Sequence, residues 1–343
     1  MSADMSGTDP EMPPVETVEA ALRKAGLIPD GVPARFRALT GGVASDIWCV
    51  EAADTVFAVK RALPKLRVAA DWRAPVSRNA AEADWLRTVA GIVPDAVPRV
   101  RFHDSASGLF AMDFLPPDRF PVWKSLLRDG IVDVGFADAV GRNLAAIHAR
   151  TAGDGELAAR FAFDEKFHAI RLEPYLEATA AKHPAIAGRL RELSRATLAH
   201  HQALVHGDVS PKNILAGPKG PVFLDAECAW YGDPAFDLAF CLNHLLLKCV
   251  WNRGATGRFL EAFDALRHAY LGMATFESPA RIDERAAALL PGLMLGRIDG
   301  KSPVEYITAE RDRQRVRDVA IPLIAAPPSG LGEVLSAWRE AST

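Results

Sequence analysis

The chain has 343 residues, of which 49% are hydrophobic and 24% charged, enough for one large or two ordinary folded domains. A net charge of −3 at pH 7 argues against nucleic acid or an anionic membrane surface as the main partner. The longest apolar runs, such as residues 289–295, are too short to span a bilayer. None of the four cysteines has Cys-x-x-Cys spacing, which favours reduced, buried thiols and a cytoplasmic protein.

The first third of the chain predicts a small, strand-rich lobe. Residues 1–14 are polar and acidic without the apolar core of a signal peptide, so we expect a flexible tail. A helix, three strands, a second helix and two further strands are then predicted at residues 15–27, 34–39, 45–51, 55–61, 79–90, 100–103 and 109–115. The Pro-Pro-Asp sequence at 116–118 predicts a boundary between a nucleotide-binding lobe, residues 15–115, and a second lobe, residues 116–343.

The second lobe is predicted to be mainly helical. Helical periodicity occurs at residues 123–127, 134–149, 164–176, 183–201, 236–250, 257–272, 279–295, 310–323 and 331–339. Two short apolar strands are expected between the fourth and fifth of these helices, and residues 230–234 are typical of a turn. The predicted fold class is therefore α+β, with a small antiparallel-sheet lobe and a larger helical lobe.

The segment between residues 203 and 227 carries the most chemical information. Asp208 follows an apolar strand and Gly207, where a carboxylate can accept the proton of an attacking hydroxyl group or hold that group in line with a γ-phosphate. The alternative is an aspartate that only caps a turn. Asn213 and Asp225 supply the oxygen ligands that magnesium prefers. Glu227 is open to two interpretations: it binds a second ion or orients a metal-bound water, or it is a surface carboxylate.

A phosphate-binding region is predicted in the first lobe. Gly41 and Gly42, with Ser45, form a loop between strands whose backbone N–H groups can approach phosphates, although a simple hairpin turn has the same pattern. Lys60 lies among apolar residues on the third strand, where it can reach the α- and β-phosphates. A buried lysine needs a carboxylate partner, and Glu82 on the following helix is the candidate. The alternative for Lys60 is an exposed edge lysine.

The end of the fifth strand is the candidate for adenine binding. Its residues are Met112, Asp113, Phe114 and Leu115, which form an apolar segment whose backbone can hydrogen-bond a base. Any buried strand would have a similar composition, so this pattern alone leaves both interpretations open.

The histidines do not have zinc-ligand spacing beside a third ligand, so a zinc site is not predicted. His206 is expected to orient the loop before Asp208, and His148 to be a core histidine with satisfied hydrogen bonds. Asp237, at the head of an apolar helix, is expected to act as a structural cap or as a loop anchor.

With these residues, the chain resembles the aminoglycoside phosphotransferase and choline kinase family, which shares the protein-kinase-like fold. The resemblance runs from about residue 34 to about residue 308 and is most specific at residues 206–213 and 225–227. It implies that Asp208 is the catalytic base, that Asn213 and Asp225 bind Mg²⁺, and that Lys60 and Glu82 anchor the phosphates of ATP.

The sequence differs from related kinases in features that bear on the substrate. Residues 225–227 read Asp-Ala-Glu where protein kinases have Asp-Phe-Gly, and no Ala-Pro-Glu segment follows, which argues against a protein substrate. Asp-x-Glu is similar to the pattern of 5-methylthioribose kinases, but the loop at residues 41–45 lacks the Gly-Asn that those enzymes lead us to expect. The segment 296–303 resembles a group of bacterial family members without an assigned substrate.

The resulting expectation is an ATP- and Mg²⁺-dependent kinase for a hydroxyl group of a small metabolite, such as a sugar, an amino alcohol or an aminoglycoside-like compound. We expect a monomer or homodimer. The alternative is a catalytically inactive, nucleotide-binding kinase-like protein. The charge of the acceptor is left open, because acidic and basic candidates both occur in the second lobe. These are Asp233, Asp237 and Glu305 for a cationic acceptor, and Arg297, Lys301 and Arg311 for an anionic one.

Overall fold

The computed structural model describes residues 15–39, 45–62 and 78–342. The predicted tail at 1–14 and the glycines Gly41 and Gly42 lie outside the described residues. The chain forms two compact units, one of Met1–Arg87 with Pro98–Leu115 and one of Thr88–Val97 with Pro116–Thr343. These differ from the lobes proposed from sequence in residues 88–97, whose short helix η1 (Pro94–Ala96) packs against a strand of the second unit.

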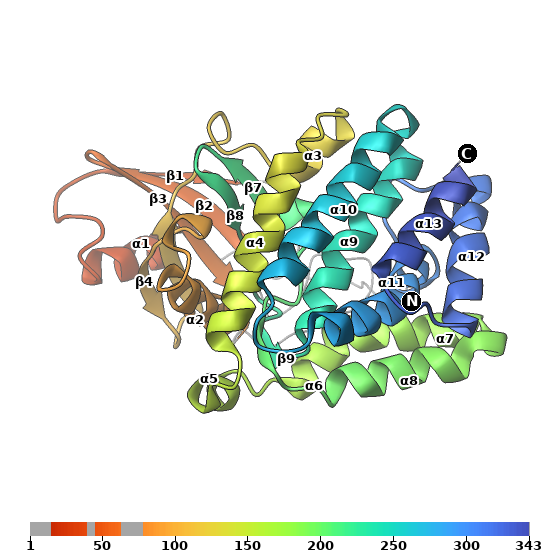
Figure 1. The fold of residues 1–343 in the computed structure, drawn as a ribbon. Coiled ribbons are helices and arrows are strands. Elements are labelled where there is room, and N and C mark those ends of the chain that lie inside the picture. Colours follow the sequence, from red (N-terminus) through yellow and green to blue (C-terminus); the bar gives the residue numbers. More distant parts are fainter. Residues whose placement is uncertain (1–14, 40–44, 63–77, 343) are drawn as a thin grey trace, which may run out of the picture. The chain divides into compact units, whose positions relative to one another are not determined.

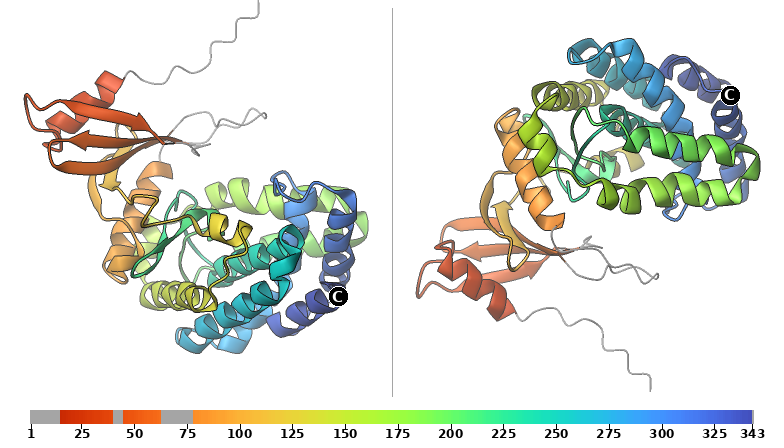
Figure 2. Two further views of the ribbon diagram at one scale, coloured as in Figure 1. Left: turned by 90° about the horizontal axis from the view of Figure 1, so that it is seen from above. Right: turned by 90° about the horizontal axis from the view of Figure 1, so that it is seen from below.

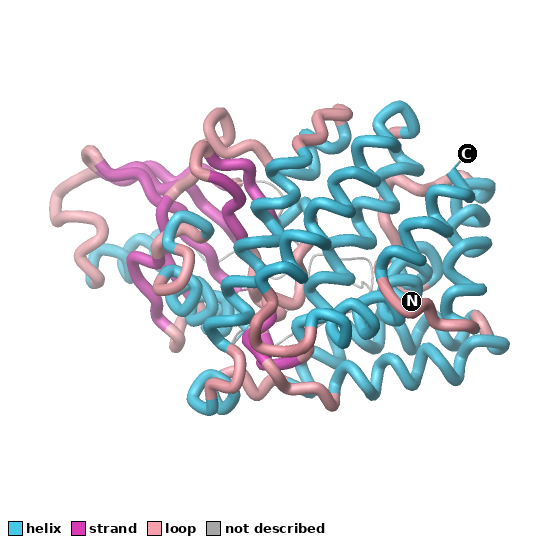
Figure 3. The backbone as a smooth tube through the Cα atoms, viewed as in Figure 1, coloured by secondary structure: helices cyan, strands magenta, loops and turns pink. Residues whose placement is uncertain are grey.

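The first unit is built on a five-stranded antiparallel sheet in the order β1-β2-β3-β5-β4, drawn in magenta in Figure 3. Its strands are β1 (Ala34–Ala38), β2 (Ser45–Ala52), β3 (Thr55–Ala62), β4 (Val100–Asp104) and β5 (Leu109–Asp113). The unit also contains helix α1 (Val15–Lys24) and most of α2 (Arg78–Ala90).

The two faces of this sheet have different roles. Trp48 and Val50 on β2, with Phe57 and Val59 on β3, form a core cluster together with Val18 and Leu22 of α1. Side chains alternate along a strand, so Lys60 lies on the opposite face from α1. The sheet core thus holds β3 in place and directs Lys60 away from it.

The second unit is mainly helical, and its longer helices pack around α9. Figure 1 shows α4, α10 and α9 side by side, and α11 also packs on α9. Every residue of α9 from Pro234 to Val250 is buried. The helices are α3 (Trp123–Arg128), α4 (Val134–Thr151), α5 (Gly155–Arg160), α9 (Pro234–Trp251), α10 (Thr256–Met273), α11 (Pro279–Asp299), α12 (Glu310–Ala325) and α13 (Leu331–Ser342), with the short η5 (Arg253–Ala255) before α10.

The helix predicted at residues 164–176 differs from the observed structure. A short α6 (Asp164–Phe167) leads into a π-helix, η2 (His168–Glu177), which contains Pro174, and α7 (Ala178–Lys182) follows. Proline lacks a backbone N–H and crowds the preceding turn, so an α-helical ladder cannot continue through it unchanged. The helix predicted at 183–201 is shorter than expected and consists of η3 (Pro184–Ile186) and α8 (Ala187–Leu198). In Figure 2, α8 lies alongside η2 in shades of green.

Two small antiparallel pairs carry the central motif of the second unit. Strand β6 (Ala203–Val205) pairs with β9 (Trp230–Gly232), and β7 (Ile214–Gly217) pairs with β8 (Gly220–Phe223). The turn predicted at residues 230–234 is therefore wrong for its first three residues, because the backbone of β6 pairs with them. The predicted α+β class, with a small antiparallel-sheet lobe and a larger helical lobe, is confirmed. Of the described helices, none has the length and apolar character needed to cross a membrane.

Candidate active site

Asp208 lies on a tight loop between β6 and η4 (Pro211–Asn213). Gly207 precedes it with a φ of +77°, and a Cβ at this position would lie 2.5 Å from the carbonyl oxygen of Cys228. Glycine is the residue that meets both the left-handed backbone and the close approach. The loop therefore depends on the Gly of His-Gly-Asp and brings Asp208 close to the segment after β8.

A buried carboxylate anchors this loop. The backbone N–H groups of His206 and Gly207 donate to Asp237 Oδ2 and Oδ1 at 2.7 and 2.9 Å. His148 Nε2 lies 3.3 Å from the same Oδ2, and the other ring nitrogen of His148 lies 2.7 Å from Tyr270 Oη. Asp237 and His148 are fully buried. The predicted loop anchor at Asp237 and the predicted core histidine are thus confirmed.

His206 joins the Asp208 loop to the loop after β8. The backbone N–H of Asp208 donates to His206 Nδ1 at 3.1 Å, so Nε2 carries the proton that reaches the carbonyl oxygen of Leu224 at 3.0 Å. Burial lowers the pKa of His206, which keeps the ring neutral in this arrangement. The predicted orienting role of His206 is confirmed.

Two cations neutralise Asp208. Its Oδ2 lies 2.9 Å from Arg171 Nη2 and 3.1 Å from Lys212 Nζ, and Arg171 Nε also donates to the carbonyl oxygen of Gly207. Burial by itself would raise the pKa of Asp208, but Arg171 and Lys212 hold this pKa below its ordinary value. Asp208 is 5% exposed, so the site contains a buried carboxylate that stays ionised at neutral pH.

The proposed metal ligands lie next to this carboxylate. Asn213 Nδ2 donates to the carbonyl oxygen of Asp208 at 3.0 Å, and the carbonyl oxygen of Asn213 accepts from Leu224 N–H at 2.9 Å. Asp225 has a φ of +66°, a strained value for a residue other than glycine. Functional residues often occupy such strained backbone conformations. The negative charge of Asp208 and, with a smaller effect, that of Asp225 raise the pKa of Lys212.

Glu227 lies two residues further on and is half-buried. Burial lowers the pKa of the Arg171 guanidinium, but nearby negative charges raise it above its ordinary value. Asp208 has a larger effect than Glu227 in raising this pKa. The structure therefore places Glu227 within electrostatic range of the site, which fits the ligand interpretation as well as the surface one.

In the part of the chain that the structure describes, no group of three His, Cys, Asp or Glu side chains could hold a metal ion by itself. One carboxylate and one carboxamide suit Mg²⁺ that also takes ligands from water and phosphate oxygens. The donor set of Asn213 and Asp225 therefore fits a metal that arrives with a nucleotide.

In the first unit, Lys60 and Glu82 form a buried ion pair. Lys60 Nζ lies 2.6 Å from Glu82 Oε2, and both residues are at most 3% exposed. Asn79 Nδ2 donates to the carbonyl oxygen of Lys60 at 3.3 Å and holds α2 against β3. The interpretation of Lys60 as an exposed edge lysine is therefore wrong, because α2 covers its face of the sheet.

The candidate adenine-binding segment begins on the face of the sheet that carries Lys60. Met112 pairs in register with Ala58, two residues before Lys60, and is buried. Asp113 is the last residue of β5, and its carboxylate accepts from Arg101 Nε at 2.7 Å. Phe114 and Leu115 follow the strand and are partly exposed. Ser45 is buried at the start of β2, directly after the undescribed residues 40–44.

Sequence reasoning missed Arg171 and Lys212. Arg171 is a lone basic residue between Ile170 and Leu172 in an apolar segment, a pattern that indicates a buried cation with a specific partner. Lys212 stands four residues after Asp208 within the motif itself, and this spacing is the signal that points to it.

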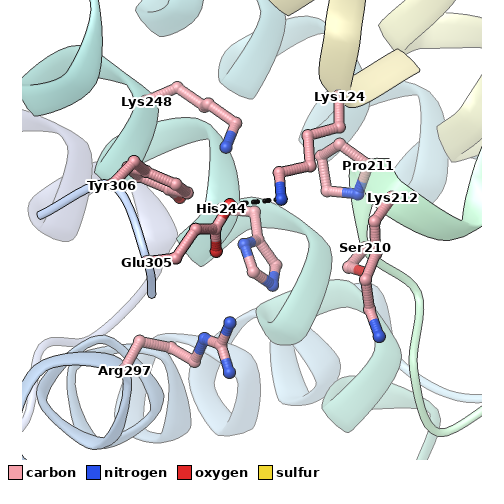
Figure 4. A pocket seen from close by; sticks show the side chains of 9 residues that line it. All are labelled: Lys124, Ser210, Pro211, Lys212, His244, Lys248, Arg297, Glu305 and Tyr306. Carbon is pink, nitrogen blue, oxygen red and sulfur yellow. Dashed lines mark hydrogen bonds and ion pairs between the residues drawn. The ribbon is translucent and has the colours of Figure 1, made fainter. Parts of the chain in front are cut away.

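A cavity of about 40 Å³ lies beside the Asp208 loop, within the second unit (Figure 4). Ser210, Pro211 and Lys212 form one wall, and residues from α3, α9, α11 and the segment after α11 form the others. Figure 4 shows the ion pair between Lys124 and Glu305 at its edge, with His244 between these residues and Arg297.

The acidic candidates for binding a cationic acceptor are engaged elsewhere. Asp233 caps α9 through the N–H of Ala235 and pairs with Arg285 at 3.1 Å, and Asp237 anchors the Asp208 loop. Glu305 alone of the three lines the cavity, where Lys124 pairs with it.

Among the basic candidates, Arg297 lines the cavity. Lys301 instead pairs with Glu173 on the surface, and the side chain of Arg311 is 82% exposed. Of the acidic and basic candidates, Glu305 and Arg297 therefore line the cavity, one from each set.

The fold is that of solved small-molecule kinases. A choline/ethanolamine kinase family protein from Mesorhizobium loti matches with a TM-score of 0.51 and 17% identity, over 94% of this chain and 99% of that one. An amicoumacin kinase, solved in complex with AMP-PNP and Ca²⁺, matches with a TM-score of 0.50 and 16% identity, over 92% and 97% of the two chains. At these identities the similarity shows the protein-kinase-like fold alone.

The chain belongs to the phosphotransferase enzyme family, whose model matches residues 35–285. A methylthioribose kinase from Geobacillus thermodenitrificans is 24% identical over 259 residues, which cover 66% of this chain and 64% of that enzyme. The chain thus spans less than two thirds of the length of this relative. The resemblance inferred from residues 206–213 and 225–227 is confirmed.

Proposed function

We propose that this protein transfers the γ-phosphoryl group of ATP, with Mg²⁺, to a hydroxyl group of a small metabolite. The observation that carries this proposal is the buried, ionised Asp208, held by Arg171 and Lys212 on a loop that Asp237 anchors. Membership of the phosphotransferase family and the similarity to methylthioribose kinases support a small acceptor.

Asp208 would orient the acceptor hydroxyl and take its proton as transfer proceeds. The hydroxyl oxygen forms the new bond to phosphorus, the bond from phosphorus to the β,γ-bridging oxygen breaks, and ADP leaves with that electron pair. Because its pKa is depressed, Asp208 is a weak base, and its main contribution would be alignment of the hydroxyl. Lys212, half exposed beside Asp208, can place its charge near the transferring phosphoryl group.

Asn213 and Asp225 would hold the Mg²⁺ ion. When bound, Mg²⁺ supplies positive charge against the β- and γ-phosphates. The negative charge of Asp225 opposes ionisation of Asp208, so a divalent cation bound at Asp225 would relieve the repulsion between the two carboxylates. Glu227 is proposed as an additional ligand or as a partner of metal-bound water.

In the first unit, Lys60, held in place by its ion pair with Glu82, would bind the α- and β-phosphates. Gly41, Gly42 and Ser45 would cover the phosphates, and Met112, Asp113, Phe114 and Leu115 would receive the adenine. A cytoplasmic location, and a monomeric or homodimeric state, stay predictions.

The experiment compares the wild-type protein with Asp208→Asn, which keeps the shape of the side chain. ADP release is measured over a library of hydroxyl compounds with ATP and Mg²⁺, and ATP affinity is measured by calorimetry. Loss of a positioned proton acceptor lowers kcat by about 10²–10⁴-fold, while the ATP affinity stays within about twofold. Lys219→Met, at an exposed position, is the control.

Near-normal turnover in Asp208→Asn would refute the role of Asp208. ATP binding without ADP release for any acceptor would instead support the alternative, an inactive nucleotide-binding protein. Omission of Mg²⁺ with excess EDTA should abolish ADP release, and activity under that condition would contradict the metal assignment.

A further inference from the structure

We infer that the cavity beside the Asp208 loop binds an anionic group, a carboxylate or a phosphate, carried by the hydroxyl-bearing acceptor. This inference rests on the proposed phosphoryl transfer and specifies the substrate class for it. It narrows the acceptor from any small alcohol to a hydroxy acid or a phosphorylated alcohol.

The charge of the lining is the first argument. Of the described residues that form the cavity wall, Lys124, Lys212, Lys248 and Arg297 are basic, and one residue, Glu305, is acidic. Lys124 is paired with Glu305 and Lys212 with Asp208, so the unbalanced charge belongs to Lys248 and Arg297, which form no ion pair with any carboxylate that the structure describes. A concave surface with this imbalance attracts anions.

Unpaired polar atoms are the second argument. Within the described part of the chain, the buried atoms Ser210 Oγ, Arg297 Nε and Tyr306 Oη have no hydrogen-bond partner, and all three residues line the cavity. Buried polar groups without partners are rare in folded proteins and cost free energy, so three around one cavity indicate a missing ligand. Each of them can donate a hydrogen bond, as an anion requires.

Lys248 is the third argument. It is 1% exposed, and its ammonium group lies 3.7 Å from the ring centre of Tyr306 and 4.3 Å from that of Trp251. It forms no ion pair with any carboxylate that the structure describes. Burial, with the nearby Lys124 and Arg297, lowers the pKa of Lys248 to about 6, whereas the Glu305 carboxylate raises it. A bound anion would supply the missing countercharge.

A purely structural explanation accounts for less of this arrangement. A lysine that only packs against two aromatic rings could extend its ammonium group to solvent, as buried lysines commonly do. Here the ammonium group lines a cavity that Arg297 and His244 also line. The guanidinium of Arg297 is held in place by Tyr175 Oη at 3.1 Å and Ser302 Oγ at 2.9 Å.

The size and position of the cavity determine which part of the acceptor it takes. A volume of about 40 Å³ holds a group the size of a few water molecules, which suits a carboxylate or phosphate but not a whole sugar. Lys212 lines the cavity and also contacts Asp208 at 3.1 Å. An acceptor with its anionic end in the cavity would therefore extend its hydroxyl group toward Asp208.

The activity experiment uses acceptors that differ in one end group. Glycerate, glycerol 3-phosphate, glycerol and 3-aminopropane-1,2-diol carry a carboxylate, a phosphate, no charge and an ammonium, and the same four end groups are tested on four- and five-carbon alcohols. We expect kcat/KM for an anionic member to exceed that of its neutral and cationic counterparts at least about tenfold. The better of the two anions identifies the group, and a preference for the neutral or cationic member overturns the inference.

Matched variants test the lining residues. Lys248→Met and Arg297→Gln should each raise KM for the anionic acceptor about 10–100-fold, the loss of one charge-assisted hydrogen bond, and leave KM for ATP within about twofold. Lys219→Met and Arg311→Gln remove exposed charges and should change neither constant. An unchanged acceptor KM in Lys248→Met would contradict the inference.

A binding experiment separates this inference from the proposed function. Acetate and inorganic phosphate are titrated without ATP into protein labelled at histidine, and the ring signals of His244, assigned with His244→Gln, are followed by NMR. Saturable shifts that disappear in Lys248→Met support an anion site even if no acceptor yields ADP. If neither anion shifts these signals, or if Lys248→Met binds them equally, the inference is wrong, whatever the activity of Asp208.

Discussion

At the residue scale, Asp237 decides whether the Asp208 loop keeps its shape. Its two carboxylate oxygens accept from consecutive backbone N–H groups, those of His206 and Gly207. An asparagine can offer one oxygen to these donors and must turn its NH₂ group toward the other. A fully buried N–H would then lose its partner.

We therefore expect Asp237→Asn to lower the free energy of unfolding by about 2–3 kcal/mol, the cost of losing a charged acceptor in a buried site. Urea unfolding measures this change, and kcat should fall as well because Asp208 loses its fixed position. Asp118→Asn, at an exposed position, serves as the control. Equal stability of the two variants would show that the loop does not depend on Asp237.

Gly207 allows a second test at this scale. In Gly207→Ala the new Cβ meets the carbonyl oxygen of Cys228 at 2.5 Å, in addition to the strain of a positive φ. Gly26 has a nearly equal φ of +74°, but no atom lies within 4 Å of the position that a Cβ would take there. Gly26→Ala should cost about 1–2 kcal/mol of stability for the backbone alone, and Gly207→Ala clearly more. Equal losses of stability in thermal or urea unfolding would show that the close approach to Cys228 does not add to the cost of Gly207→Ala.

At the scale of elements, the π-helix η2 brings Arg171 to the Asp208 loop. Arg171 donates to the carbonyl oxygen of Gly207 and pairs with Asp208, so in the proposed reaction it would be a positioning residue that acts through that carboxylate. Removal of its charge raises the pKa of Asp208 toward the value that burial favours.

In Arg171→Met, the acidic limb of the pH profile of kcat/KM should accordingly move to higher pH, because Asp208 must be ionised to act. Arg311→Met is the matched control with an exposed guanidinium. A merely structural arginine would lower the melting temperature and leave this limb in place, and that result would reject the positioning role.

The same elements show what sequence could predict. The β-branched and aromatic residues between Gly and Asp turns predicted the strands β2 and β3, and the apolar neighbours of Lys60 predicted its inward position, because both signals are local in the sequence. The motif residues Asp208, Asn213 and Asp225 could be found since one short segment contains them. Arg171 could not be placed in this way, because its contact with Asp208 depends on the packing of a helix that Pro174 alters.

The cavity could not be predicted from the sequence either, because its lining residues are far apart in the chain. Lys124, Lys248 and Arg297 come from α3, α9 and α11, and only tertiary packing brings them together. From sequence, Lys248 belonged to an apolar helix, and Arg297 was one of several charges with an open role. The strand β9 was missed because the Gly-Asp-Pro sequence at its end is typical of a turn, and the pairing with β6 is a tertiary contact.

At the scale of the whole molecule, we expect the buried Lys248 to lower the stability of the fold. With a pKa of about 6 in the folded protein and of about 10.4 when exposed, it binds a proton more readily in the unfolded chain. The cost is largest below pH 6, falls as the pH rises, and is absent above about pH 10.4.

Lys248→Met should therefore raise the melting temperature at pH 7, by about 2–4 °C for each kcal/mol gained, and the gain should shrink toward pH 10. Calorimetry between pH 6 and pH 10 provides the measurement, with Lys219→Met as the control. A lysine that stabilised the fold through its aromatic contacts would give the opposite sign. A stabilised variant with weakened acceptor binding is the behaviour of a residue retained for function.

The four cysteines have a practical consequence. All are buried, and burial raises the pKa of each thiol, to about 12 at Cys228 and Cys249. Almost no thiolate exists at neutral pH, so alkylating reagents should spare them. Cysteines introduced at the exposed positions Asp54 and Lys219, one in each unit, would then react selectively with a pair of fluorophores. Energy transfer between these labels would report whether added nucleotide changes the distance between positions 54 and 219, with every native cysteine left in place.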